Sequence, residues 1–323
     1  MRVLVTGGAG FIGSHIVDVL RGEGHECFVV DNLSSGSPDN LPADVRLFEV
    51  DIRDGDRLRE VFDEVRPDWV SHQAAQMSVS RSVREPAFDA EVNVMGLLNV
   101  LGESQRCGVQ RLTFASSGGV LYGDVESPAD EDHPADPISP YGISKWVGER
   151  YLQFYARDYG LKSVALRYAN VYGPRQNPHG EAGVVAIFCT KMLQGEAATV
   201  NGDGKYIRDY VYCEDVARAN LAVFQSESDA GFRAYNVGTS VPTDVNELEV
   251  SLRTACGAVL KEVGSELQVP EAGHGPPRAG DLRSSLVSYA RAQQDLGWQP
   301  QVALDDGITQ TARWFYDKLS AGA

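Results

Sequence analysis

The sequence is short of basic residues. Lysine and arginine together number 29, against 45 aspartates and glutamates, which gives a formal net charge of -16 at pH 7. A surface of this sign repels phosphate backbones and anionic lipid headgroups unless a local basic patch intervenes. The composition therefore argues against nucleic acid or a membrane surface as a partner.

Cysteines and long apolar runs are also scarce. The five cysteines, at positions 27, 107, 189, 213 and 256, form neither a CxxC pair nor a cysteine–histidine spacing of the zinc-binding type. No apolar run approaches the ~18 residues that cross a bilayer. The chain also enters a glycine-rich loop directly after residues 1–6, which leaves no room for a signal peptide. We expect a cytoplasmic protein with reduced cysteines and no metal site.

Internal repeats and low-complexity tracts are absent, and 323 residues of average hydrophobic content suffice for one large domain or two. In the first half, short apolar runs rich in β-branched residues alternate with helical stretches. This pattern is typical of a parallel sheet covered by helices on both faces. The runs lie at residues 3–5, 27–30, 45–48, 69–70, 112–115 and 163–166. We expect an α/β fold with a doubly wound parallel sheet.

The second half has a different character. After Arg167 the sequence becomes rich in loops and short helices, and Gly202-Asp203-Gly204 predicts a hairpin turn. We assign residues 1–167 to the doubly wound unit. Residues 168–323 form a smaller α/β part that faces the substrate, and we expect its chain to cross back to the sheet.

The first expected strand ends in a glycine loop. Gly7, Gly10 and Gly13 lie between this strand and a helical run over residues 14–20. Without side chains there, the backbone N–H groups and the helix N-terminus can approach a pyrophosphate. The spacing alone is weak evidence, because the chain contains 33 glycines.

Asp31 supports the interpretation of the glycine loop as part of a dinucleotide-binding site. It ends the second expected strand, where a carboxylate accepts hydrogen bonds from the adenosine ribose and repels a 2′-phosphate. This favours NAD over NADP. Asp31 could instead be a solvated residue that begins the turn over residues 31–36. Asp51, after the third strand, could likewise contact adenine or simply belong to a turn.

A second group of residues points to proton transfer. Ser139 and Pro140 predict the N-cap and first position of a helix that ends near Tyr159, before Gly160. Tyr141 and Lys145 then lie one turn apart on the same face. An ammonium beside a phenol lowers the pKa of the phenol and makes it a plausible proton acceptor. By itself, such a pair could also be a solvated helix face.

Ser116 and Ser117 end the fifth expected strand, at the edge where doubly wound sheets place their chemistry. A serine hydroxyl there could hydrogen-bond the reacting oxygen. The two serines could also be ordinary turn residues before Gly118 and Gly119.

Several further segments match a known pattern along nearly the whole chain. They are Thr6-Gly7-Gly8-Ala9-Gly10-Phe11-Ile12-Gly13, Asp31-Asn32, Asp51-Ile52, His72-Gln73-Ala74-Ala75, Asn93-Val94-Met95-Gly96, Tyr141-Gly142-Ile143-Ser144-Lys145, residues 167–175, Arg208-Asp209-Tyr210 and Arg278-Ala279-Gly280-Asp281. With them the chain resembles the extended short-chain dehydrogenase/reductase family, and within it the NAD-dependent UDP-hexose 4-epimerases. The resemblance implies a Rossmann-type cofactor domain over residues 1–167 and a domain over residues 168–323 that mainly binds the UDP-sugar.

The resemblance also implies roles for individual residues. The catalytic group is Tyr141, Lys145 and Ser117. The residues expected to bind NAD are Gly7, Gly10, Phe11, Ile12, Gly13, Asp31, Asn32, Ser35, Gly36, Asp51, Ile52, Gln73, Ala74, Ala75, Asn93, Ser116, Tyr141, Lys145 and Tyr168. Those expected to bind the UDP-sugar are Ser117, Tyr141, Asn170, Val185, Asn201, Arg208, Arg278, Asp281 and Ser285. Arginines suit a diphosphate because of their forked donors, although any one of them could instead form a surface ion pair.

In the implied reaction, Tyr141 takes the proton of the sugar 4-hydroxyl while a hydride passes to NAD, and the 4-ketose turns and is reduced on its other face. Many epimerases have Ser or Thr where this chain has Gly118, so Ser117 would have to substitute. Glycines cannot move protons, which argues against the elimination chemistry of the related dehydratases.

Ser285 stands where family members restricted to plain hexoses have a bulky tyrosine. We therefore expect UDP-GlcNAc and UDP-GalNAc to be accepted beside UDP-Glc and UDP-Gal. The alternatives are a UDP-uronate 4-epimerase, another sugar-nucleotide enzyme of the family, or a non-catalytic sensor of NAD or nucleotide sugars. The family also implies a homodimer. Apolar residues over 88–107 and 140–159 agree with one, but could equally be buried within the subunit.

Overall fold

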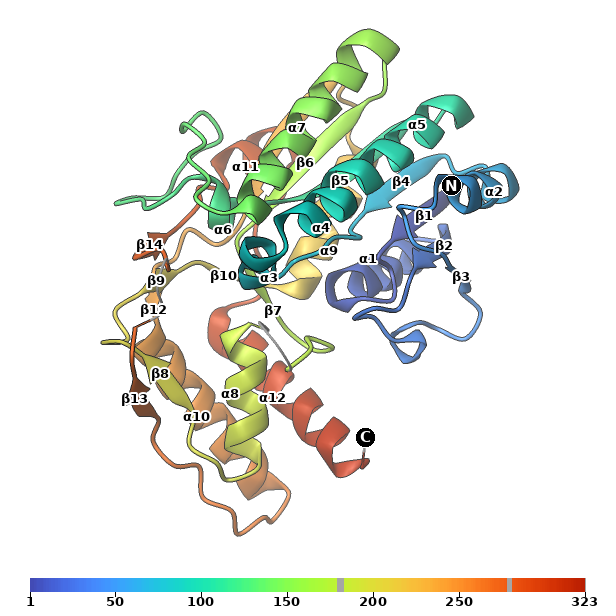
Figure 1. Ribbon diagram of the computed structural model, residues 1–323. Helices are drawn as coiled ribbons and strands as arrows, with labels where there is room; N and C mark the ends of the chain where they lie inside the picture. Colours follow the sequence, from blue (N-terminus) through green and yellow to red (C-terminus); the bar gives the residue numbers. More distant parts are fainter. Residues whose placement is uncertain (179–182, 278–280, 323) are drawn as a thin grey trace.

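A seven-stranded parallel sheet forms the centre of the molecule (Figure 1), in a computed structural model that describes residues 1–178, 183–277 and 281–322. The strands are β1 (Arg2–Thr6), β2 (Glu26–Asp31), β3 (Arg46–Glu49), β4 (Trp69–His72), β5 (Arg111–Ser117), β6 (Ser163–Tyr168) and β11 (Phe232–Val237). Their order is β11-β6-β5-β4-β1-β2-β3, and every neighbouring pair is parallel. The order reverses between β1 and β4, which is where such sheets bind ligands. The expected doubly wound α/β fold is confirmed.

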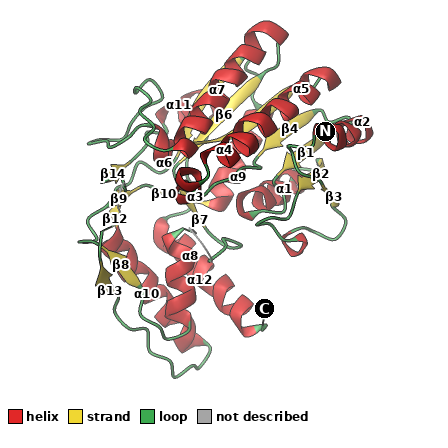
Figure 2. Cartoon of the chain, viewed as in Figure 1, coloured by secondary structure: helices red, strands yellow, loops and turns green. Residues whose placement is uncertain are grey.

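Helices cover both faces of this sheet, as Figure 2 shows. One face carries α2 (Gly55–Val65), α5 (Leu97–Cys107) and α7 (Pro140–Tyr159), and the other carries α1 (Phe11–Gly22), α9 (Cys213–Gln225) and α11 (Ala290–Leu296). Within β1, Leu4 packs into the first core, whereas Val3 and Val5 pack into the second. Alternate side chains point to opposite faces of a strand, so burial on both faces explains the unbroken apolar runs.

Short elements line the carboxyl edge of the sheet. They are η1 (Pro38–Asn40), α3 (Val79–Arg84), α4 (Pro86–Ala90), the π-helical segment η2 (Glu91–Gly96) and α6 (Gly118–Leu121). The segment from α3 to η2 packs against α7. It therefore lies next to the helix that carries Tyr141 and Lys145.

The second part of the chain has its own apolar core (Figure 1, below the sheet). It is built from α8 (Val184–Leu193), α10 (Val245–Glu262) and α12 (Leu304–Ser320). Short strands complete it: β7 (Asn170–Tyr172) with β10 (Tyr210–Tyr212), β9 (Ile207–Arg208) between β12 (Thr243–Asp244) and β14 (Ser284–Ser285), and β8 (Thr199–Asn201) with β13 (Gly273–Gly275). The strand β11 leaves this part and pairs with β6, so residues after position 167 complete the central sheet.

The expected hairpin at residues 202–204 is wrong. The turn exists, because Gly202 and Gly204 have φ angles of 64° and 70°. Its flanking strands, however, pair with other segments: β8 with β13, and β9 with β12 and β14. A glycine turn determines a local change of direction, whereas the partner of a short strand depends on distant residues.

A buried ion pair joins α7 to the sheet. Arg167 on β6 donates to both carboxylate oxygens of Glu149 on α7, at 2.9 and 2.7 Å, and both side chains are at most 5% exposed. The hydroxyl of Ser116 donates to the same carboxylate at 2.6 Å. On its other side Arg167 donates to Tyr122, whose hydroxyl donates to Asn236 on β11. The network thus links β5, β6, β11 and α7.

Replacing Arg167 by Met should lower the free energy of unfolding by about 3–5 kcal/mol, because Glu149 then remains buried without its partner. Urea unfolding followed by circular dichroism measures the change. In the double variant Arg167→Met/Glu149→Leu, neither charge of the pair remains and most of the loss should be recovered. An Arg167→Met protein as stable as the wild type would show that the pair does not fasten α7.

Candidate active site

The glycine loop at the end of β1 is closely packed at two positions and open at a third. A Cβ atom at Gly7, which has a φ of 69°, would lie 2.6 Å from the backbone nitrogen of Ala74, and one at Gly13 would lie 2.1 Å from the Gly7 oxygen. At Gly10 a Cβ would meet only the Gly7 oxygen, at 3.1 Å. The protein's own packing therefore requires Gly7 and Gly13. Gly10 leaves room for an external group.

The N-terminus of α1 faces this opening. Its N-cap is Gly10, no side chain caps it, and its first turn contains no acidic residue. The first N–H groups of a helix have no partners within the helix and attract anions. The loop and α1 together fit the diphosphate of a dinucleotide.

Asp31 lies beside the loop at the end of β2. Its carboxylate accepts hydrogen bonds from the N–H groups of Ala9 and Leu33, at 3.0 and 2.9 Å. Burial raises the pKa of Asp31, and these backbone donors oppose the shift. A carboxylate has about four acceptor positions, so capacity remains for ribose hydroxyls. Gly36 packs on the same loop, since a Cβ there would lie 2.9 Å from the Ala9 oxygen.

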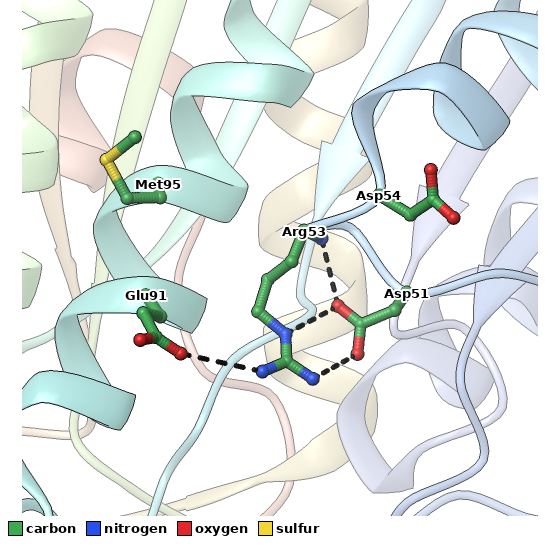
Figure 3. A pocket seen from close by; sticks show the side chains of 5 residues that line it. All are labelled: Asp51, Arg53, Asp54, Glu91 and Met95. Atoms are coloured by element: carbon green, nitrogen blue, oxygen red, sulfur yellow. Dashed lines mark hydrogen bonds and ion pairs between the residues drawn. The ribbon is translucent and has the colours of Figure 1, made fainter.

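Beyond β3 lies a pocket of about 450 Å³. Figure 3 shows the side chains that line it, which are Asp51, Arg53, Asp54, Glu91 and Met95. Arg53 binds Asp51 through Nε and Nη2, at 3.0 and 2.8 Å, and its Nη1 lies 3.8 Å from Glu91. The Arg53 guanidinium holds the pKa of Asp51 well below its ordinary value. The sequence points to Asp51 but not to Arg53 or Glu91, because nothing in the sequence indicates which partner an exposed charged residue will contact.

The helix over residues 140–159 is confirmed, with the predicted ends. Ser139 caps it by accepting from the N–H of Gly142 at 3.2 Å, and Gly160 ends it in the left-handed conformation. Lys145 is 3% exposed, and its Nζ lies 4.9 Å from the ring centre of Phe114 and 5.7 Å from that of Tyr141. Phenol and ammonium are therefore neighbours in a largely dry site.

Burial shifts both of these groups toward their neutral forms. It raises the pKa of Tyr141 to about 12 and lowers the pKa of Lys145 to about 8. The Ser117 side chain lowers the pKa of Tyr141 through hydrogen bonding to the phenol. Ser117, which the sequence suggests as a catalytic residue, is the last residue of β5.

Gly118 has a packing reason of its own. A Cβ atom at this position would lie 2.8 Å from Cγ1 of Val287 and 3.1 Å from the backbone oxygen of Arg167. A Ser or Thr at residue 118 would therefore need Val287 to move. The hydroxyl of Ser116, in contrast, donates its hydrogen bond to Glu149.

A polar network holds the first turn of α7. The N–H of Tyr141 donates to Ser82 at 3.1 Å, and Ser144 donates to the Tyr141 carbonyl at 2.9 Å. Asn93 of η2 donates to Ser144 at 3.2 Å and to Asp89 at 3.0 Å. The Asn93 amide is thus turned into the protein. Single-turn π-helical segments often occur at functional sites, but spacing could not reveal which residues meet in this one.

Two residues expected near the cofactor share another network. The hydroxyl of Tyr168 donates to Gln73 at 3.2 Å and accepts from Asn220 of α9 at 2.8 Å. Asn220 is fully buried and also accepts from Thr113 at 2.8 Å. Nothing in the sequence distinguishes Asn220, because polar residues are common in any amphipathic helix.

The structure brings together only some of the residues expected to bind the UDP-sugar. Arg208 and Asp281 are brought together, with Nη2 and Oδ1 at 2.5 Å, and Ser285 donates to the Gly119 carbonyl at 3.3 Å. Asn170 donates to the Asp209 carbonyl at 3.3 Å. Val185 of α8, by contrast, is fully buried in the apolar core of the second part, so only its backbone could face a ligand.

For the remaining residues expected to bind NAD or the UDP-sugar, the structure gives the element in which each one lies. Arg278 lies outside the described residues, and Asn201 ends β8. Positions around the glycine loop and the strand ends are Phe11 and Ile12 in α1, Asn32, Ser35 and Gly36 after β2, Ile52 after β3, and Ala74 and Ala75 after β4.

None of the helices in the described part of the chain is long and apolar enough to cross a membrane. The same residues contain no group of three or more His, Cys, Asp or Glu side chains that could hold a metal ion.

Known proteins share this architecture and much of the sequence. A UDP-glucose 4-epimerase of Mycolicibacterium smegmatis is 44% identical over 324 residues, with 98% of this chain and 99% of the relative covered. A UDP-glucose 4-epimerase of Thermotoga maritima, solved with UDP-glucose, is 47% identical with a TM-score of 0.90, covering 99% of this chain and 100% of the other. The Thermus thermophilus UDP-glucose 4-epimerase, solved with NAD, is 46% identical with a TM-score of 0.90, covering 98% and 99%.

The family assignment agrees with the site. A model described as the NAD dependent epimerase/dehydratase family matches residues 3–238, which include the glycine loop, Asp31, Ser117, Tyr141 and Lys145. The expected relation to the UDP-hexose 4-epimerases is confirmed by the similar proteins, and NAD is the cofactor named in the description of the family. The chain belongs to the NAD dependent epimerase/dehydratase family.

Proposed function

We propose that the protein is an isomerase that interconverts UDP-hexoses at carbon 4 with NAD as its bound cofactor. The observation that carries the proposal is the meeting of the Tyr141 phenol with Ser117 and the Lys145 ammonium, at the sheet edge that also presents the glycine loop. The similar proteins named as UDP-glucose 4-epimerases support the same substrate class.

The reaction needs one group that can take a proton from the sugar 4-hydroxyl and give it back. Tyr141 would take up and return this proton. Ser117 would hydrogen-bond the oxygen at carbon 4 of the sugar, and Lys145 would stabilise the phenolate of Tyr141. Because burial raises the pKa of Tyr141 to about 12, the phenol needs a nearby positive charge to act at neutral pH. Bound NAD supplies a reversible hydride acceptor. The enzyme then ends each cycle unchanged.

We assign the cofactor mainly to residues 1–167 and the UDP-sugar mainly to residues 168–323. Arg208 would offer a forked donor to the diphosphate after exchanging its contact with Asp281. Because acidic residues outnumber basic ones in this chain, a diphosphate needs a local positive charge, which Arg208 would supply. Asn170, at the start of β7, would contact the same end of the substrate.

We further propose a cytoplasmic homodimer. All five cysteines are free thiols, as suits a reducing compartment. Met95, Ile143 and Phe154 are exposed apolar residues on η2 and α7, on the face where a second copy would bury them. Leu101 of α5 is excluded from this surface, because it is fully buried within the subunit.

Tyr141→Phe should reduce the interconversion of UDP-Gal and UDP-Glc on the order of 10²-fold to 10⁴-fold, because it removes only the hydroxyl that moves the proton. Chromatographic separation of the two sugar nucleotides measures the rate. Tyr159→Phe, at the exposed end of the same helix, is the matched control and should leave the rate unchanged. A wild-type protein that binds NAD but converts no sugar nucleotide would indicate a sensor instead.

Gly13→Ala should lower the NAD content of the purified protein about tenfold or more, since hydrogen bonds to a charged phosphate lose their alignment when the loop is displaced. The reason is the 2.1 Å approach of the new Cβ to the Gly7 oxygen. Gly22→Ala is the matched control, because a Cβ at Gly22, at the other end of α1, would meet nothing within 4 Å. Absorbance and enzymatic assay of the released nucleotide quantify both. Equal NAD contents would argue against this loop as the diphosphate site.

Ser285→Tyr should remove turnover of the N-acetylated sugars while sparing UDP-Gal. Ser285 is 5% exposed and close to Gly119, so a phenol ring there would take space beside Ser117. We expect the ratio of kcat/KM for UDP-GalNAc to that for UDP-Gal to fall roughly tenfold or more. An unchanged ratio in a folded variant would exclude Ser285 as the residue that sets substrate width.

A further inference from the structure

Asp89 is a buried carboxylate that the proposed reaction does not use. It lies in α4, is 1% exposed, and its Oδ1 accepts from Nε2 of Gln76 at 2.8 Å and from Nδ2 of Asn93 at 3.0 Å. Its other oxygen, Oδ2, is buried and has no hydrogen-bond partner among the described residues. A buried carboxylate stays ionised only when a positive charge compensates it, and otherwise it takes up a proton. An ionised Asp89 therefore needs such a charge nearby.

Few charged groups face Asp89 from the elements around it. The helix α7 packs against α4 and is joined to Asp89 by the hydrogen bonds of Asn93 to Asp89 and to Ser144. On this helix, Tyr141 and Lys145 both interact with Asp89 electrostatically. From β4, His72 lies near Lys145, but burial lowers its pKa to about 3 and it is neutral.

The nearby arginines are engaged elsewhere. On α3, Arg81 is paired with Glu85 at 3.1 Å, and Arg84 donates to Ser80 at 3.1 Å. Arg53, which stacks on Phe88 of α4, is held by Asp51. Lys145 is the cation left to face Asp89 within the described part of the chain.

We propose that Asp89 is a positioning residue that keeps the buried Lys145 side chain in its ammonium form, and so fixes the charge of the Tyr141–Lys145 pair. This inference rests on the proposed function, because it gives a role to the pair in proton transfer. Asp89 touches neither substrate nor cofactor in this account. It acts through Lys145 and, by way of Asn93 and Ser144, on the first turn of α7.

The electrostatic effect of Asp89 has two sides. Its negative charge opposes the effect of burial on Lys145, whose pKa is lowered to about 8 with both effects included, and it also raises the pKa of Tyr141. Without Asp89 the ammonium would lose its proton near neutral pH, and the phenolate would lose its stabilising partner. The cost is a phenol that is harder to ionise. The arrangement therefore makes sense only where a charged lysine is essential.

Asp89→Asn tests the proposal with little change of shape. The Asn oxygen can still accept from Gln76 and Asn93, and its amide takes the place of the unpartnered Oδ2. Removal of a negative charge eases proton loss from both neighbours, so both limbs of the pH profile of kcat/KM should move to lower pH, by roughly one unit. If Asp89 only supports the fold, kcat falls and the limbs stay in place.

A spectroscopic titration gives a second readout that does not depend on turnover. The near-ultraviolet absorbance of the Tyr141 phenolate is obtained by subtracting the titration of Tyr141→Phe from that of the parent protein. In the Asp89→Asn background the same difference should show ionisation at lower pH. This measurement reports on Asp89 even if the wild type proves not to be an epimerase, so the failure of one proposal is distinguished from the failure of the other.

Glu85→Gln is the matched control. It removes the same charge from the start of α4, but Glu85 is about half exposed and is paired with Arg81. Solvent screens such a charge, and both limbs should remain where they are in the wild type. Equal shifts in Glu85→Gln and Asp89→Asn would overturn the proposal, because they would reflect net charge rather than the buried carboxylate.

A stability cycle covers the case in which Asp89→Asn does not fold alone. Lys145→Met leaves Asp89 without its counter-charge and should lower the melting temperature. Adding Asp89→Asn to Lys145→Met should then raise it again, because the uncompensated carboxylate is gone. A further fall in the double variant, or superimposable pH profiles for Asp89→Asn and wild type, would refute the role of Asp89.

Discussion

The buried ion pair between Arg167 and Glu149 determines where the reactive side chains of this protein can be. Tyr141, Lys145 and Glu149 follow one another at intervals of four along α7, so they share one face of the helix. Holding Glu149 against β6 with two hydrogen bonds fixes the rotation of that face relative to the sheet. Apolar packing alone would tolerate sliding or rotation of α7, whereas two parallel bonds to a guanidinium have one geometry.

Burial of Tyr141 and Lys145 opposes their ionisation, but it also strengthens the electrostatic effect of neighbouring groups on them. Removing water moves the pKa of Tyr141 up and that of Lys145 down, which disfavours the two charged forms that the reaction needs. In the same dry environment, however, each remaining charge acts strongly on its neighbours. A few well-placed groups, Ser117 on one side and Asp89 on the other, can therefore decide the protonation of the pair. The acidic surface does not supply that control, because solvent screens it.

The glycines illustrate two different reasons for the same residue. Gly7 and Gly13 are required by the protein itself, since a Cβ atom at each would meet backbone atoms at 2.6 Å or less, and a Cβ atom at Gly118 would need Val287 to move. At Gly10 a Cβ atom would meet only the Gly7 oxygen, at 3.1 Å. The absence of a side chain there is explained by the diphosphate expected at the N-terminus of α1. The distinction matters at Gly118, where the absence of a hydroxyl follows from contact with Val287 and leaves Ser117 as the partner of Tyr141.

The sequence by itself determined the local elements: six strands of the sheet, the glycine loop, and the two ends of α7. Each of these depends on residues within a few positions of one another, such as the cap at Ser139 and the stop at Gly160. Only the tertiary structure decided which distant segments meet. It identified β11 as the segment that crosses back to the sheet, paired β8 and β9 with partners from residues 243–285, and turned Asn93 inward onto Asp89 and Ser144. Burial, and with it the pKa values of Tyr141 and Lys145, comes from the packing of segments far apart in the chain, and no short stretch of sequence contains that information.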